Sequence, residues 1–79
     1  MNDYAKKLKE IIAEELKCQA KDITDDAGWN RFYNWDSLAH IGIISAVEKQ
    51  FSIQIENSQI MELKDFDSIL QYINKQKNN

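Results

Sequence analysis

The chain has 79 residues, of which 43% are hydrophobic, and its formal net charge is −3. A chain of this length forms one small domain whose core supplies only about 3 to 5 kcal/mol of net stability, which excludes a deep active site beside that core. The acidic balance and the scattered Lys and Arg residues exclude the basic surface that nucleic-acid binding requires. The longest apolar run, residues 41–47, is too short to span a bilayer, and no signal-peptide pattern opens the chain. We therefore expect a cytoplasmic, soluble monomer that binds neither nucleic acid nor membranes.

The first predicted element is a helix over residues 3–17, which Asn2 or Asp3 can cap. Its apolar positions follow the helical period and share one face: Tyr4, Leu8, Ile11, Ile12 and Leu16. Cys18 follows directly and is the single cysteine, so it has no partner for a disulfide within the chain. We interpret it as a half-buried or exposed structural thiol rather than a nucleophile.

A loop over residues 18–35 is predicted next, because the helical period stops and turn-forming residues accumulate. A connection of this length needs contacts with the core. The side chains expected to make them are Ile23, Trp29, Tyr33 and Trp35. Phe32, beside Arg31, is expected to be exposed.

The second predicted helix covers residues 37–51 and carries apolar residues on two faces. At about 100° per residue, the face that meets the core holds His40, Ile43, Ile44, Val47 and Phe51. The opposite face holds Leu38, Ile41, Ser45 and Glu48. That second face is either buried under neighbouring helices or is an exposed patch that docks a partner. We interpret His40 as packed and hydrogen-bonded rather than catalytic, because no nucleophile or carboxylate has matching helical spacing.

An extended connector and a short helix are predicted after that point. Residues 52–56 alternate like a strand but have no second strand to pair with, so we expect an extended segment. A short third helix is expected over residues 57–62, with Asn57 or Ser58 as its cap.

A fourth helix is predicted over residues 65–75, capped by Asp65, with a fraying polar tail at residues 75–79. Gly42, inside the second helix, indicates close packing there by a neighbouring helix or by a partner. The expected fold is a single all-α domain over residues 1–79, a small four-helix bundle with three main helices and one short one.

Asp36 and Ser37 stand where the long loop meets the second helix. Both residue types are frequent helix N-caps, so a structural cap is one interpretation. The other is modification, because a phosphate ester on Ser37 would face unpaired backbone N–H groups and the positive end of the helix macrodipole. The apolar residues Leu38 and Ile41 beside Ser37 favour the second interpretation.

The chain resembles acyl carrier proteins and peptidyl carrier domains, small four-helix bundles in which an Asp-Ser-Leu motif opens the second helix. The matching motif is Asp36-Ser37-Leu38, and the resemblance extends over nearly the whole chain. It implies that Ser37 receives a 4′-phosphopantetheine group from coenzyme A, attached by a phosphopantetheinyl transferase with magnesium. It also implies that Asp36 engages the transferase and its metal, while the chain holds no resident metal.

The partner interface follows from the same resemblance. Residues matching Leu38 and Ile41 contact partner enzymes in such families, and Ser45 and Glu48 extend the expected interface along that side of the helix. The implied partners, besides the transferase, are a ligase that loads acyl or aminoacyl groups and a downstream acyltransferase or synthase.

The resemblance implies a carrier that is not an enzyme and that holds acyl or aminoacyl intermediates as thioesters. Glu48 is the only acid of the second helix, whereas carriers of fatty acid synthesis usually have a heavily acidic one. Trp35 and the run of residues 38–41 are more similar to stand-alone carriers of specialised clusters, such as those that modify polysaccharides or load amino acids. The alternative is a helical interaction module of the same fold with an unmodified serine, and replacement of Ser37 by Ala separates the two.

Overall fold

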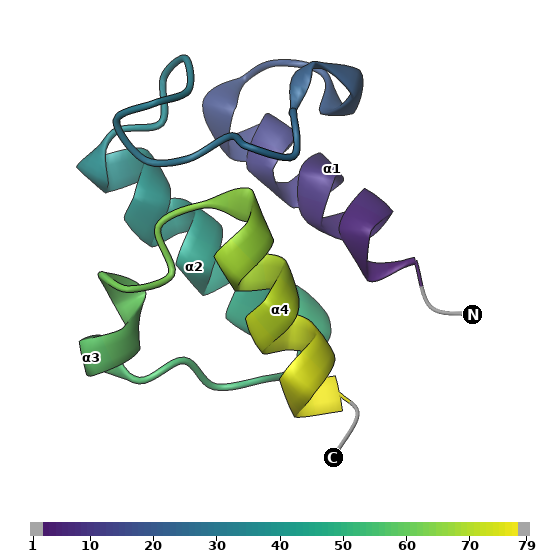
Figure 1. Ribbon diagram of the computed structural model, residues 1–79, viewed down its shortest axis with the longest axis vertical. Coiled ribbons are helices and arrows are strands. Elements are labelled where there is room, and N and C mark those ends of the chain that lie inside the picture. The colour runs from purple at the N-terminus through teal and green to yellow at the C-terminus, as the bar shows by residue number, and fades with distance from the viewer. Residues whose placement is uncertain (1–2, 78–79) are drawn as a thin grey trace.

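The computed structural model describes residues 3–77, which form a bundle of helices (Figure 1). The elements are α1 (Tyr4–Leu16), a 3-10 turn η1 (Ala20–Asp22), α2 (Ser37–Phe51), α3 (Asn57–Ile60) and α4 (Phe66–Lys77). In the view of Figure 1, α4 stands in front of the second half of α2, and the short α3 is set to one side on its own connector. α1 is the helix that packs against both α2 and α4. The prediction of an all-α bundle with three main helices and one short one is confirmed.

The core forms where the apolar faces of the three long helices meet. The helices supply these fully buried side chains: Leu8, Ile12 and Leu16 from α1, Ile43, Ile44 and Val47 from α2, and Ile69 and Ile73 from α4. Each such side chain contributes about 1.5 to 3 kcal/mol when it leaves water. The core face predicted for α2 is confirmed in full, because His40 and Phe51 are buried with the three aliphatic residues.

Side-chain caps set where the long helices begin. The carboxylates of Asp3, Asp36 and Asp65 accept hydrogen bonds from the amides of Lys6, Ala39 and Ser68 at 3.1, 2.9 and 2.8 Å. Each cap satisfies one amide that has no partner within its helix. α2 begins at Ser37 as predicted, whereas α1 and α4 begin one residue after the predicted starts at 3 and 65, because Asp3 and Asp65 are the caps. Asn2, the other cap expected for α1, lies outside the described residues.

The short helix α3 differs from its prediction at both ends. Its N-cap is Glu56, with no side-chain hydrogen bond, so the expected cap by Asn57 or Ser58 was wrong. It ends at Ile60 rather than at residue 62, because the chain must turn there to bury Leu63 and to bring the Lys64 carbonyl to the loop.

The loop before α2 is anchored by three of the four expected side chains, but Phe32 takes the place of Tyr33. Ile23 and Trp35 are buried and Trp29 packs partly on the core. Tyr33, however, is 71% exposed, while Phe32 is the ring that packs against the core, so both of those predictions were wrong. The turn that closes from the Trp35 amide to the Phe32 carbonyl at 3.1 Å directs Phe32 inward. The 3-10 turn η1 was not anticipated either.

The C-terminal helix is longer than predicted. Residues 75–77 are helical, and the Lys77 ammonium donates to the Phe51 carbonyl at 3.0 Å, so the expected fraying is wrong for this stretch. Asn78 and Asn79 lie outside the described residues. At Gly42, an added Cβ would meet the carboxylate of Glu15, so the neighbour that packs closely there is α1.

Candidate functional site

The start of α2 presents Ser37 to solvent. Asp36 is in an extended conformation, and its Oδ1 accepts from the Ala39 amide, which makes Ser37 the first helical residue. Ser37 is exposed, and within residues 3–77 its hydroxyl makes no hydrogen bond. The amides of Ser37 and Leu38 also lack partners in this part of the chain, as expected for the first turn of a helix. A negatively charged ester on Ser37 therefore fits the local electrostatics.

A buried network supports this turn from below. Trp35 and His40 are each 1% exposed. The Trp35 indole Nε1–H donates to His40 Nδ1 at 3.0 Å, and His40 Nε2 lies 2.9 Å from the carbonyl oxygen of Ile60. The His40 ring also stacks on Trp29, with centroids 5.1 Å apart and planes at 14°. The prediction that His40 is packed and hydrogen-bonded is confirmed.

The hydrogen bond between Trp35 and His40 was not predicted from the sequence. Trp35 was expected to anchor the loop and His40 to lie on the core face of the helix, and no periodicity connects a loop residue to a helical one. The available signal was composition, because both tryptophans and the only histidine of the chain fall within residues 29–40.

Asn34 links the same loop to the end of α1. It has a left-handed backbone, with φ at 63°, which Asn tolerates better than most residues. Its carbonyl accepts from the Asp36 amide at 3.0 Å, and its side-chain amide donates to the Leu16 carbonyl at 3.4 Å. The backbone that leads into Ser37 is thereby fixed against α1.

The outer face of α2 is exposed from Leu38 to Ser45. Leu38 is 80% exposed and Ile41 is 58% exposed, so burial of this face under other helices is ruled out. Ser45 is exposed as well. Glu48 is half-buried, and its Oε2 accepts from the Ile55 amide at 2.8 Å, which places one of its oxygens in the fold. Apart from the exposed Asp36 at its start, the outer face of α2 thus offers mainly apolar surface beside Ser37.

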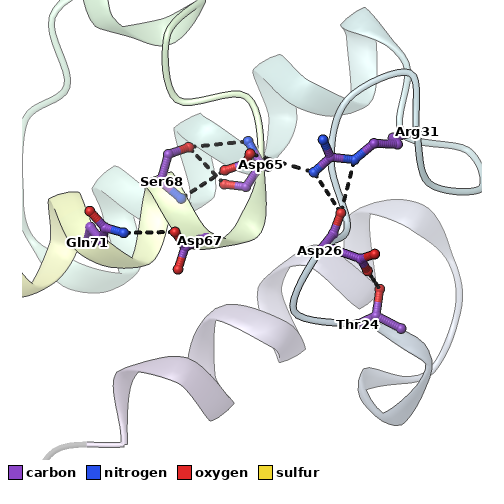
Figure 2. Close-up of polar contacts among 7 residues, drawn as sticks. All are labelled: Thr24, Asp26, Arg31, Asp65, Asp67, Ser68 and Gln71. Carbon is purple, nitrogen blue, oxygen red and sulfur yellow. Dashed lines mark hydrogen bonds and ion pairs between the residues drawn. The ribbon is translucent and has the colours of Figure 1, made fainter.

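The start of α4 is also capped by an aspartate, Asp65, which Figure 2 shows. Asp65 Oδ1 accepts from the Ser68 amide at 2.8 Å, and the Asp65 amide donates back to Ser68 Oγ at 3.3 Å. Hydrogen bonding from the Ser68 side chain lowers the pKa of Asp65, partial burial opposes this, and the nearby Arg31 guanidinium adds to the lowering. This carboxylate is committed to the fold.

Cys18 is half-buried, in agreement with its interpretation as a structural thiol. Burial raises the pKa of the Cys18 thiol, and the negative charge of Asp22 raises it further. Since the thiolate is the reactive form, both effects make this thiol less reactive than a free cysteine.

The fold and the exposed serine define a small carrier domain, and comparison with known proteins agrees. The family described as "Phosphopantetheine attachment site" matches residues 6–73, so the chain belongs to that family. It is 31% identical to the acyl carrier protein of Buchnera aphidicola subsp. Schizaphis graminum, over 94% of each chain. It is 27% identical to those of Thermosynechococcus vestitus, over 92% of this chain and 90% of the relative, and Porphyromonas gingivalis, over 95% and 96%. The chain is a member of the acyl carrier protein family.

The cofactor of this family is 4′-phosphopantetheine, held covalently, and its members are carriers rather than catalysts. The residues at the start of α2 fit that group, because the free Ser37 hydroxyl and the unpaired first-turn amides suit a phosphate ester. None of the helices in the described residues has both the length and the apolar composition needed to cross a membrane.

Proposed function

We propose that Ser37 is the attachment residue for 4′-phosphopantetheine and that the chain carries acyl or aminoacyl groups in the cytoplasm. The observation that supports this most directly is the exposed Ser37 hydroxyl, free of hydrogen bonds within the described residues, at the first position of α2. When bound, the cofactor supplies a terminal thiol that holds these groups as thioesters. In this proposal the transferase brings the base that removes the proton of the Ser37 hydroxyl.

Asp36 has two roles in this proposal. Its Oδ1 caps α2 through the Ala39 amide at 2.9 Å, whereas its Oδ2 makes no hydrogen bond in the described residues. The residue is exposed, so Oδ2 is available to the transferase and to the magnesium ion that the transferase brings. A carboxylate that is already oriented by its own helix can approach the metal with little further ordering.

The partner surface in this proposal is the outer face of α2. Leu38 and Ile41 provide apolar area beside Ser37, and Ser45 continues it. Glu48, the remaining residue of the expected interface, is partly engaged with Ile55. The loading ligase and the downstream acyltransferase or synthase would then meet an apolar surface rather than an acidic one, which favours a specialised carrier over the fatty acid synthesis carrier.

The test is intact mass after incubation with coenzyme A, magnesium and a broad-specificity phosphopantetheinyl transferase. The wild type should gain one phosphopantetheine, about 340 Da from its covalent structure. Ser37→Ala should gain nothing, and Ser45→Ala is the matched control because Ser45 is another exposed serine of α2. A thiol titration of the unfolded product should also find one thiol more than Cys18 provides.

An absence of mass gain in a folded wild type, with the transferase active on another carrier, would contradict the proposal. The chain would then act as an interaction module of the same fold with an unmodified serine. In that case Ser37→Ala should retain partner binding, whereas Leu38→Asp should lose it.

A further inference from the structure

His40 makes side-chain hydrogen bonds to two segments outside its own helix. Its Nδ1 accepts from Trp35, which stands two residues before Ser37, and its Nε2 lies within hydrogen-bond distance of Ile60, the last residue of α3. Its backbone belongs to the first turn of α2, where its amide donates to the Asp36 carbonyl at 2.8 Å. One side chain therefore connects the loop, α2 and α3.

The two hydrogen bonds require one form of the imidazole. An indole N–H can only donate, so Nδ1 must be without a proton to accept from Trp35. A backbone carbonyl can only accept, so Nε2 must carry the proton that goes to Ile60. The neutral tautomer protonated on Nε2 is the only form that makes both bonds, because the charged form has two donors.

The helix α3 depends on this contact more than the longer helices do. It has four residues, none of them buried, and its N-cap makes no side-chain hydrogen bond. A helix this short is not stable by itself. Within residues 3–77, the bond from His40 to Ile60 is the only hydrogen bond that joins α3 to another helix.

We propose that His40 is a positioning residue that holds the Ser37 turn and α3 in a fixed relation. The bond to Trp35 orients the loop that presents Ser37, and the bond to Ile60 fixes α3 beside it. The two bonds are separable, because they use different ring nitrogens. This inference rests on the proposed function only where the reaction of Ser37 is measured.

Two substitutions divide the bonds. Asn at position 40 places its amide oxygen near the site of Nδ1, so His40→Asn keeps an acceptor for Trp35 and loses the donor to Ile60. Gln reaches one carbon further, so His40→Gln keeps a donor for Ile60 and loses the acceptor for Trp35. Ile69→Val, in the buried face of α4, is the control for a core change distant in sequence from this network.

The first readouts do not involve modification of Ser37. Nitrogen NMR of the wild type at pH 7 should show a neutral imidazole protonated on Nε2. Loss of a buried bond should speed local hydrogen exchange about tenfold. His40→Asn should do this at the Ile60 and Leu63 amides, and His40→Gln at the Trp35 indole N–H, while Ile69→Val leaves the ratio between these reporters unchanged.

The second readout is the rate of phosphopantetheine transfer to Ser37. His40→Gln frees the loop that presents the hydroxyl, so kcat should fall about tenfold with KM changed much less. The kcat of His40→Asn should stay at least about threefold above that of His40→Gln, because His40→Asn keeps the bond to Trp35. Trp35→Phe should match His40→Gln, since it removes the same bond from the other side.

A wild-type imidazole that is protonated on Nδ1 or charged at pH 7 would overturn the inference, as would substitutions that move both exchange reporters equally. Equal kcat for His40→Gln and Ile69→Val would also overturn it, because His40 would then act only as core. If the wild type gains no phosphopantetheine, the proposed function fails, while the NMR and exchange results still decide whether His40 holds the loop and α3 together.

Discussion

The starts of α2 and α4 both contain an aspartate and a serine, but the serine has a different role in each. Each helix begins after an aspartate whose carboxylate accepts an amide three residues ahead, Asp36 at 2.9 Å and Asp65 at 2.8 Å. At α4 the first-turn serine is Ser68, which lies in the third position and folds back onto Asp65. At α2 it is Ser37, which lies in the first position and whose hydroxyl makes no hydrogen bond within residues 3–77.

The position of serine within the first turn decides what it can do. A serine at the third position reaches the cap residue, so its hydroxyl is used by the fold. A serine at the first position cannot bond back to the cap residue in this way, so its hydroxyl stays available for modification. The purely structural interpretation of the Asp-Ser pair as a helix cap is therefore correct for Asp36 but does not account for Ser37.

The start of α4 is also the more enclosed of the two, and this gives the largest predicted effect. Gly28 pairs with Asp65 through backbone bonds from Trp29 to Lys64 and from Phe66 to Ala27, at 2.8 and 2.9 Å. A Cβ at Gly28 would lie 2.9 Å from the Asp65 Cβ and 3.2 Å from the Lys64 carbonyl oxygen. Gly28→Val should lower the free energy of unfolding by about 1 to 3 kcal/mol in urea titrations.

The control for this steric effect is Gly42→Ala, because the three atoms nearest to an added Cβ there all belong to the flexible Glu15 side chain. Alanine there should be neutral or raise the stability by up to about 1 kcal/mol, from its better helix propensity. Equal losses for the two variants would show that the enclosure of α4 has no special role.

Removal of the two caps should separate stability from function. Asp65→Ala and Asp36→Ala each remove one cap, so each should lower the free energy of unfolding by about 0.5 to 2 kcal/mol. Only Asp36→Ala should also slow phosphopantetheine transfer, because Asp65 lies outside the proposed site. Comparable transfer rates for the two variants, measured by intact mass over time, would contradict the proposed role of Asp36.

The stability of the wild type should depend on pH through the Asp65 carboxylate, and the neutral variant Asp65→Asn should lack this dependence. Its folded pKa is lowered, chiefly by Ser68, so the ionised form stabilises the fold. That contribution is complete above the ordinary aspartate pKa of about 3.9 and is lost as the pH falls further, through the folded pKa. The stability gap between wild type and Asp65→Asn should therefore be widest near neutral pH and shrink below about pH 4. A gap that stays constant in urea titrations between pH 7 and pH 3 would exclude this linkage.

The serines themselves should give a smaller difference in stability. Ser68→Ala removes the hydroxyl that bonds back to Asp65, at a cost of about 0.5 to 1.5 kcal/mol. Ser37→Ala removes a hydroxyl without partners and should stay within about 0.5 kcal/mol of wild type. Thermal and urea unfolding of the unmodified proteins measure both, and a larger loss for Ser37→Ala would show that its hydroxyl is part of the fold.

Periodicity predicted the long helices because burial and helix geometry act on the same residues. The residues of both faces of α2 could be assigned from angular position, but whether the face of Leu38 and Ile41 is buried or exposed was decided only by the structure. The caps at Asp3 and Asp65 were also predictable, since a cap needs only a short acceptor just before the apolar period begins.

The loop and α3 were less predictable because nonlocal contacts set them. Which of Phe32 and Tyr33 turns inward depends on backbone angles near Asn34, whose φ is 63°, and adjacent aromatic residues carry no period. His40 contacts the carbonyl of Ile60 at the end of α3, and the Trp29 amide donates to the Lys64 carbonyl in the turn that follows, so both contacts come from other segments of the chain. For the same reason the support beneath Ser37 became visible only in three dimensions.

The smallest effect tests whether the start of α2 favours a negative charge at position 37. Ser37→Asp places a carboxylate at the first helical position, near the unpaired amides, whereas Ser37→Asn is of the same size without the charge. The aspartate variant should be more stable than the asparagine variant by about 0.3 to 1 kcal/mol at low salt, and repulsion from Asp36 moves the value toward the lower end. The difference should shrink in 1 M salt, because this site is exposed and such charges are screened. An asparagine variant of equal or greater stability at low salt would mean that the first turn of α2 gives no electrostatic support to a phosphate ester, and that the environment of Ser37 is set by exposure alone.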